Sequence, residues 1–196
     1  MSDKKYDIIL ADPPWEYYGS KTKDQAAGKW YDCMSDVDIM RLGVRDRWAS
    51  DRSVIFMWTT CPRLDLGIEV LKEWGFYFRG VGFVWIKTKS DCVTPIGAQG
   101  VRPSIIKPTT ELVIVGSTVE RGRPLPLKSE SVRQVVWDVD SGPEAVLSPR
   151  PENVHSRKPE VVRSRIDELF SVDHSRIELF ARRRFPGWDA WGDQLE

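Results

Sequence analysis

A hydrophobic run that stops at two prolines sets the first limit on the fold. Residues 6–11 read YDIILA, and Asp12-Pro13-Pro14-Trp15 follows directly. A run that is apolar on both faces is typical of a strand buried in a parallel sheet with helices on either side. Proline has no backbone N–H for a sheet ladder, so the two prolines end the strand. The chain therefore places a carboxylate, two stiff residues and a large ring at the carboxyl end of a buried strand.

Downstream, runs typical of strands alternate with runs of helical period. Further strands are predicted at 53–58, 76–87, 111–116, 132–139 and 176–181, and helices at 35–43, 61–75 and 157–170, whereas the tail from 182 has no clear period. Ser35 with Asp38 resembles a capping box, Gly43 and Gly75 suit helix ends, and Pro62 suits a first turn. The alternation predicts an α/β fold with a mostly parallel sheet and helices on both faces. Ligands of such sheets bind beyond the carboxyl ends of the strands.

Composition narrows the class of protein. The chain has 196 residues, of which 41% are hydrophobic, and this favours one globular domain over 1–196 with no separate target-recognition domain. Lys+Arg and Asp+Glu balance at 29 each, so any surface for nucleic acid has to be local. Three cysteines without a C-x-x-C pair argue against a disulfide framework or a metal site and suit a reducing cytoplasm. No apolar run approaches the ~20 residues of a membrane helix, and no signal peptide is evident.

Several motifs in one order resemble a known enzyme family. Asp12-Pro13-Pro14-Trp15 is followed by WYDCMS (30–35), IFMWTT (55–60), TELVIVG (110–116), HSRKPE (155–160) and IELFARRRFPGWDAWGDQ (177–194). This series resembles the MT-A type adenine-N6 methyltransferases, which include the catalytic subunit of the eukaryotic messenger-RNA adenosine methyltransferase. It is most similar to the compact bacterial and phage members, generally DNA adenine methyltransferases. The resemblance implies a Rossmann-like, circularly permuted fold, with the catalytic motif first and the cofactor region last, and S-adenosylmethionine as methyl donor.

The chemistry of the first motif agrees with this resemblance. The lone pair of an adenine amine is delocalised into the ring, so acceptors aimed at its N–H groups favour the pyramidal nitrogen that attacks a methyl group. Asp12 offers a carboxylate and Pro13 a backbone carbonyl that is held by the fixed φ of proline. Pro14 stiffens the turn, and Trp15 can stack on the base. The structural alternative is a rigid turn with a core Trp.

The resemblance also implies the residues that bind the cofactor. In addition to Asp12 and Pro13, these are His155, Ser156, Lys158, Phe180, Arg182, Asp193 and Gln194. A lysine can neutralise the carboxylate of the donor, and a helix N-terminus adds partial positive charge; a surface Lys before an ordinary helix is the alternative. Relatives usually carry Asn where this chain has Asp193. A carboxylate can accept from two ribose hydroxyls, so we expect the contact to survive.

A loop after the first motif mixes aromatic and basic residues. Stacking platforms beside cations are what a flipped-out or single-stranded base needs. The expected contacts are Tyr17, Tyr18, Lys29, Trp30 and Tyr31, joined by Arg184 from the RRR cluster. A solvated face is the alternative reading of these charges.

The resemblance, with which the chemistry of the Asp12 motif agrees, implies an S-adenosylmethionine-dependent enzyme that methylates the N6 amine of adenine, with DNA preferred to RNA as the partner. The same reaction on RNA and a pseudoenzyme that only binds nucleic acid remain open. We expect no membrane association and no metal, a monomer or homodimer, and a bacterial or phage-infected cytoplasm as the location. With no room for a recognition domain, we expect short or relaxed target specificity.

Overall fold

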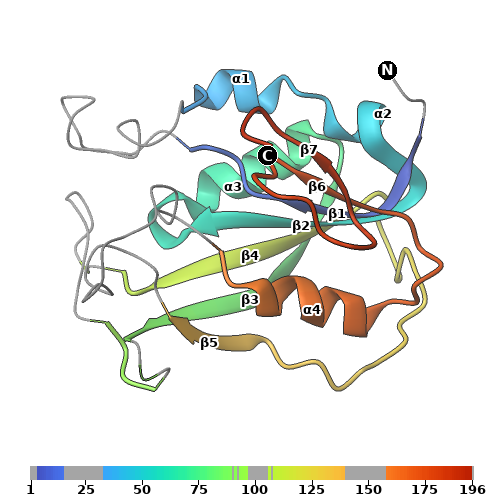
Figure 1. The fold of residues 1–196 in the computed structure, drawn as a ribbon. Coiled ribbons are helices and arrows are strands. Elements are labelled where there is room, and N and C mark those ends of the chain that lie inside the picture. Colours follow the sequence, from blue (N-terminus) through green and yellow to red (C-terminus); the bar gives the residue numbers. More distant parts are fainter. Residues whose placement is uncertain are drawn as a thin grey trace.

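The computed structural model describes residues 4–15, 33–89, 91, 93–96, 106, 108–139 and 158–195, and within these a seven-stranded sheet forms the centre of the molecule (Figure 1). The strands are β1 (Tyr6–Ala11), β2 (Ala49–Thr60), β3 (Tyr77–Thr88), β4 (Thr110–Ser117), β5 (Val135–Val139), β6 (Arg176–Leu179) and β7 (Asp189–Trp191). Their order across the sheet is β5-β3-β4-β2-β1-β6-β7. The predicted first strand is therefore flanked by β2 and β6.

The directions of the strands decide which residues share an edge of the sheet. β1 runs parallel to β2 and β6, β3 to β5, and β6 to β7. Only β4 is antiparallel to its described neighbours, β2 and β3. The predicted mostly parallel sheet is confirmed. The reversal of β4 was not predicted, and it brings the first residues of β4 to the edge where β1 and β2 end.

Helices cover both faces, as predicted (Figure 1). They are α1 (Asp36–Met40), α2 (Val44–Trp48), the 3₁₀ helix η3 (Cys61–Arg63), α3 (Leu64–Glu73) and α4 (Glu160–Leu169). On one face Ile39, Trp48 and Leu71 pack in a core with β1 and β2 residues. On the other, Val162 and Ile166 of α4 pack in a second core. The sheet is thus the middle of three layers, which explains why β1 is apolar on both faces.

The helix ends follow the local chemistry, with one correction. Ser35 caps α1, because its Oγ accepts from the Asp38 N–H at 3.1 Å. The short helix predicted over 35–43 is confirmed as α1, but it ends near Arg41, and a second helix that was not predicted, α2, begins at Val44. Gly43 does not stop the first helix but precedes the second, with a φ of +58°. Such a positive φ is accessible to glycine at little cost.

The tail contributes β7, which the sequence did not predict. The Ala181 N–H donates to the Trp191 carbonyl at 2.9 Å, so the tail returns beside the end of β6. The Trp191 ring packs between Trp48 and Phe180, with centroid distances of 5.0 and 5.5 Å. The tail is therefore fixed to the sheet near the carboxyl ends of its parallel strands.

Across the described residues, none of the helices has the length and apolar character needed to cross a bilayer. The permuted order of catalytic and cofactor regions stays a prediction.

Candidate active site

The Asp-Pro-Pro-Trp motif forms a tight turn at the carboxyl end of β1. The Asp12 N–H donates to the Leu179 carbonyl at 3.3 Å, which keeps Asp12 on the sheet. The Trp15 N–H then donates to the Pro13 carbonyl at 2.8 Å, a three-residue turn centred on Pro14. A carbonyl oxygen has two lone pairs, so the Pro13 carbonyl can accept a second hydrogen bond. The prolines thus hold a carboxylate and a backbone acceptor at the same edge.

The Asp12 carboxylate lies in a row of alternating charges. The Lys158 ammonium is 3.2 Å from Asp12 Oδ1 and 3.3 Å from Glu111 Oε2. The other Glu111 oxygen is 2.8 Å from Lys87 Nζ. The four side chains are between 13% and 23% exposed, so solvent screens these contacts only in part. Two lysines and two carboxylates therefore form one electrostatic unit, and they come from the residue after β1, from β3, from β4 and from the segment before α4.

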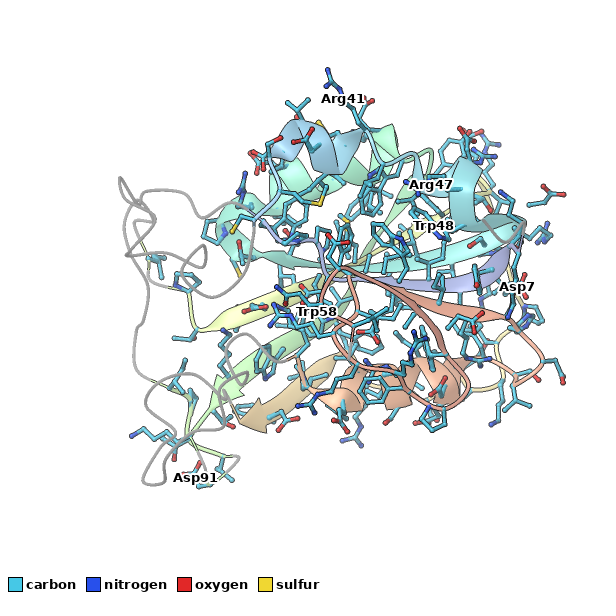
Figure 2. The ribbon with its side chains drawn as sticks, turned by 45° about the horizontal axis from the view of Figure 1, so that its top comes forward. Asp7, Arg41, Arg47, Trp48, Trp58 and Asp91 are labelled. Atoms are coloured by element: carbon cyan, nitrogen blue, oxygen red, sulfur yellow. The ribbon has the colours of Figure 1, made fainter. Side chains whose placement is uncertain are left out.

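Each of the two lysines in this row of charges lies over a tryptophan ring. Lys158 lies over the ring of Trp58 at 5.6 Å and Lys87 over the ring of Trp85 at 4.9 Å, both within reach of cation–π attraction. The two rings pack edge to face with centroids 6.1 Å apart. Figure 2 labels Trp58 in the middle of the molecule. Buried rings thereby limit where each ammonium can lie.

A pocket opens above Asp12. It is lined by Asp12, Pro13, Pro14, Trp15, Trp58, Thr59, Thr60, Glu111, Lys158 and Arg182, and holds about 460 Å³, part of it open to solvent. The whole Asp-Pro-Pro-Trp motif, Lys158 and Arg182 are thus brought together at one pocket.

The two carboxylates of the pocket differ in acidity. Burial acts to raise the pKa of Glu111, but Lys158 and Lys87 outweigh it and bring the pKa down to about 2. Burial raises the pKa of Asp12 above its usual value, with help from the charge of Glu111, and Lys158 and Arg182 only partly oppose this. Glu111 is therefore ionised at neutral pH, whereas Asp12 has the greater affinity for a proton.

The other predicted site residues either lie in the described part of the chain without lining this pocket or lie outside the described residues. Phe180 packs on Trp191 and is not among the pocket-lining residues; it has a φ of +61°. Arg184, Asp193 and Gln194 are exposed. Their predicted contacts stay predictions. Seven predicted residues lie outside the described part of the chain: Tyr17, Tyr18, Lys29, Trp30, Tyr31, His155 and Ser156.

Sequence reasoning missed Glu111, Lys87 and Trp58. Glu111 is the second residue of β4, and in an all-parallel arrangement it would lie at the edge opposite Asp12. The antiparallel pairing of β4 reverses this. A signal was present, because a charged residue at the start of an otherwise apolar strand is costly to bury without a partner.

Comparisons with known proteins identify relatives along the whole chain. The family model described as MT-A70 matches residues 6–194. Type II methyltransferase M.MunI from Mycoplasma sp is 31% identical, over 98% of this chain and 78% of that protein. N(6)-adenine-specific methyltransferase METTL4 from Mus musculus is 27% identical, over 98% of this chain and 38% of that protein. N(6)-adenosine-methyltransferase non-catalytic subunit METTL14 from Xenopus tropicalis is 36% identical, over 44% of this chain and 18% of that protein. The chain thus spans well under half the length of these two animal relatives.

Proposed function

The chain belongs to the MT-A70 family of methyltransferases, and on this premise we propose that it transfers a methyl group from S-adenosylmethionine to the N6 amine of adenine in DNA. The observation that carries the proposal is the convergence of Asp12, the Pro13 carbonyl and Lys158 at one pocket walled by Trp15 and Trp58. Two acceptors beside aromatic walls fit a flat base with an exocyclic amine. We assign Asp12 and Pro13 as the groups that hold this amine.

The pocket chemistry fits the proposed donor. S-adenosylmethionine carries a carboxylate, an ammonium and a sulfonium, and when bound it supplies an electrophilic methyl group. Lys158 and Arg182 are cations of the pocket suited to the carboxylate, and Asp12 is an anion suited to a positively charged group. For the ribose we keep Asp193 and Gln194 as proposed contacts, with Phe180, His155 and Ser156 as further members of the cofactor region.

In the proposed reaction the N6–carbon bond forms as the sulfur–carbon bond breaks, and the amine loses one proton. Hydrogen bonds from the amine to Asp12 and to the Pro13 carbonyl localise its lone pair and orient it. The raised pKa of Asp12 suits it to accept the proton. Little other acid–base chemistry is required, so most of the acceleration comes from positioning, an effect that can reach roughly 7–11 kcal/mol.

DNA is the proposed substrate because the match to a bacterial type II methyltransferase extends along 98% of the chain, whereas the match to METTL14 covers 44%. A base has to leave the duplex to enter such a pocket. We propose that Tyr17, Tyr18, Lys29, Trp30 and Tyr31 contact the extruded nucleotide, with exposed Arg184 near a phosphate.

The test is incubation of the purified protein with donor labelled with tritium in the methyl group. Duplex DNA, single-stranded DNA and RNA of one sequence serve as acceptors, and the labelled nucleoside is identified by chromatography. We expect N6-methyldeoxyadenosine from DNA and a loss of at least about 100-fold for Asp12→Ala. Asp51→Ala, an exposed aspartate at the start of β2, is the control and should retain activity.

Each outcome of this test decides one part of the proposal. Label only in RNA would refute DNA as the substrate, and label on cytosine would refute the base. A protein that binds the donor but labels none of the three acceptors would be a pseudoenzyme. Equal labelling by Asp12→Ala would remove Asp12 from catalysis.

A further inference from the structure

A buried arginine contacts the catalytic turn from outside the pocket. We propose that Arg63 is a positioning residue for methyl transfer, which with Asp36 fixes the ring of Trp15 and thereby the Pro13 carbonyl. This proposal deepens the proposed function and rests on it. Arg63 belongs to η3, after β2, and does not line the pocket.

Arg63 is held by a strong local pair. Its side chain is 8% exposed, and its Nη2 lies 2.5 Å from Oδ2 of Asp36, the first residue of α1. Burial of a guanidinium is costly unless a carboxylate and hydrogen bonds compensate. The ion pair with Asp36 therefore restricts where the Arg63 guanidinium can lie, and it joins the start of α1 to η3, which follows β2.

The same guanidinium faces the ring of Trp15. The Arg63 carbon Cζ is 5.8 Å from the ring centroid, within the range of cation–π attraction. The edge of the ring is also fixed, because the Trp15 indole N–H donates to the Trp58 carbonyl at 3.1 Å. One contact to its face and one to its edge thus hold the buried Trp15 ring at the pocket wall.

Two backbone contacts carry this constraint to the proposed catalytic groups. The Trp15 N–H donates to the Pro13 carbonyl, so the direction of that acceptor depends on where Trp15 lies. The Met34 N–H donates to the Pro14 carbonyl at 3.1 Å, two residues before Asp36. Arg63 thus contacts both chain segments that hold the turn. In addition, the Thr59 hydroxyl, which lines the pocket, donates to the Arg63 carbonyl at 3.1 Å.

Arg63 affects the position of the Pro13 carbonyl, and the rate of the proposed reaction depends on how well the reacting groups are aligned. A misplacement of about 1 Å in a reaction that depends on alignment can lower the rate by roughly 100-fold. Loss of Arg63 should therefore lower the rate of the chemical step and leave donor binding nearly unchanged, since Arg63 is not itself among the residues proposed to bind the donor.

The test compares Arg63→Met, Arg63→Lys, Asp36→Asn and the double variant Arg63→Met/Asp36→Asn with the wild type. Single-turnover methylation of DNA gives the rate of the chemical step, and calorimetry gives the affinity for the donor. Each variant is assayed at a temperature the same number of degrees below its own unfolding midpoint. Arg63→Met should lower the rate by about 10- to 100-fold with donor affinity within threefold, and Arg63→Lys should recover part of the rate. The double variant should be no slower than Arg63→Met, because both residues act as one unit.

Arg176→Met is the matched control. Arg176 is equally buried and pairs with Asp167 at 2.9 Å, but it begins β6, at the opposite edge of the sheet from Asp12. It should lower stability without lowering the single-turnover rate. If Arg63→Met methylates within twofold of the wild type, or if Arg176→Met slows the reaction as much, the positioning role is refuted.

A second readout separates this proposal from the proposed function. Fluorine NMR of protein labelled with 5-fluorotryptophan gives a resonance for Trp15, assigned with Trp15→Phe. Asp36→Asn retains Arg63 but removes its anion, and we expect the Trp15 resonance to shift or broaden. An unchanged Trp15 resonance in Asp36→Asn would refute the proposal that Arg63 and Asp36 fix the Trp15 ring. If the wild type methylates none of the acceptors but Asp36→Asn still shifts the Trp15 resonance, the proposed function is refuted and the fixing of the Trp15 ring by Arg63 and Asp36 is supported.

Discussion

Replacing Glu111 by glutamine removes one negative charge from between two lysines and preserves the shape of the side chain. Lys158 and Lys87 bring the pKa of Glu111 from 4.5 to about 2. One pKa unit corresponds to ~1.4 kcal/mol, so the ionised form is stabilised by about 3 kcal/mol in the folded protein. The side chain is only 13% exposed, so solvent removes little of this. We expect Glu111→Gln to lower the free energy of unfolding by about 3 kcal/mol at pH 7.

The sign of the pH dependence follows from the lowered pKa. The stabilisation is present above the unfolded pKa of 4.5 and is lost as the pH falls toward about 2. The difference between wild type and Glu111→Gln should therefore shrink from about 3 kcal/mol at pH 7 to about 2 kcal/mol at pH 3.5. Urea denaturation at both pH values, followed by circular dichroism, measures it.

The control is Glu130→Gln. Glu130 pairs with Arg123 at 2.7 Å, but these side chains are 72% and 62% exposed. Exposed pairs contribute about 0–1 kcal/mol, so this variant should change stability little. A loss of less than about 1 kcal/mol for Glu111→Gln, or a loss equal to that of Glu130→Gln, would show that the row of charges is not the stabilising unit described above.

Three further predictions concern the same edge of the sheet. Because burial raises the pKa of Asp12, the acid limb of the single-turnover rate should lie above the usual range of an aspartate; a limb at or below that range would contradict the assignment. Lys158 lowers the pKa of Asp12, so Lys158→Met should move the acid limb of the pH–rate profile to higher pH. Glu111 raises the pKa of Asp12, so Glu111→Gln should move the acid limb to lower pH. Gly192→Ala would place a Cβ 2.4 Å from the Ala181 carbonyl oxygen, so urea denaturation should show that the free energy of unfolding falls by about 1–3 kcal/mol. If the neighbouring Asp193 contacts the ribose, calorimetry should also show a weaker affinity for the donor.

Local signals predicted the parts of the fold that depend on neighbouring residues. The apolar run before Asp12 is β1, Ser35 caps α1, and Gly75, with a φ of +85°, ends α3 as expected. Each depends on steric or hydrogen-bonding rules that act over a few residues. β7 could not be found in this way, because three residues have no measurable period. It forms because the Trp191 carbonyl accepts from Ala181 and because Gly192 has no side chain to clash there.

The candidate site also contains residues that sequence motifs predict and one that only the strand pairing brings there. Asp12 and Lys158 belong to motifs that the sequence displays, whereas Glu111 joins them only because β4 runs against its neighbours. This partner changes the chemistry expected of Lys158. A lone lysine before a helix would serve only the carboxylate of a ligand, but Lys158 already bridges two carboxylates of the protein. When Asp12 turns to an amine, Glu111 can keep the ammonium at the pocket. In the proposed reaction β4 therefore supplies an anion that leaves Asp12 available to the substrate amine, and Glu111→Gln should slow methyl transfer as well as destabilise the fold.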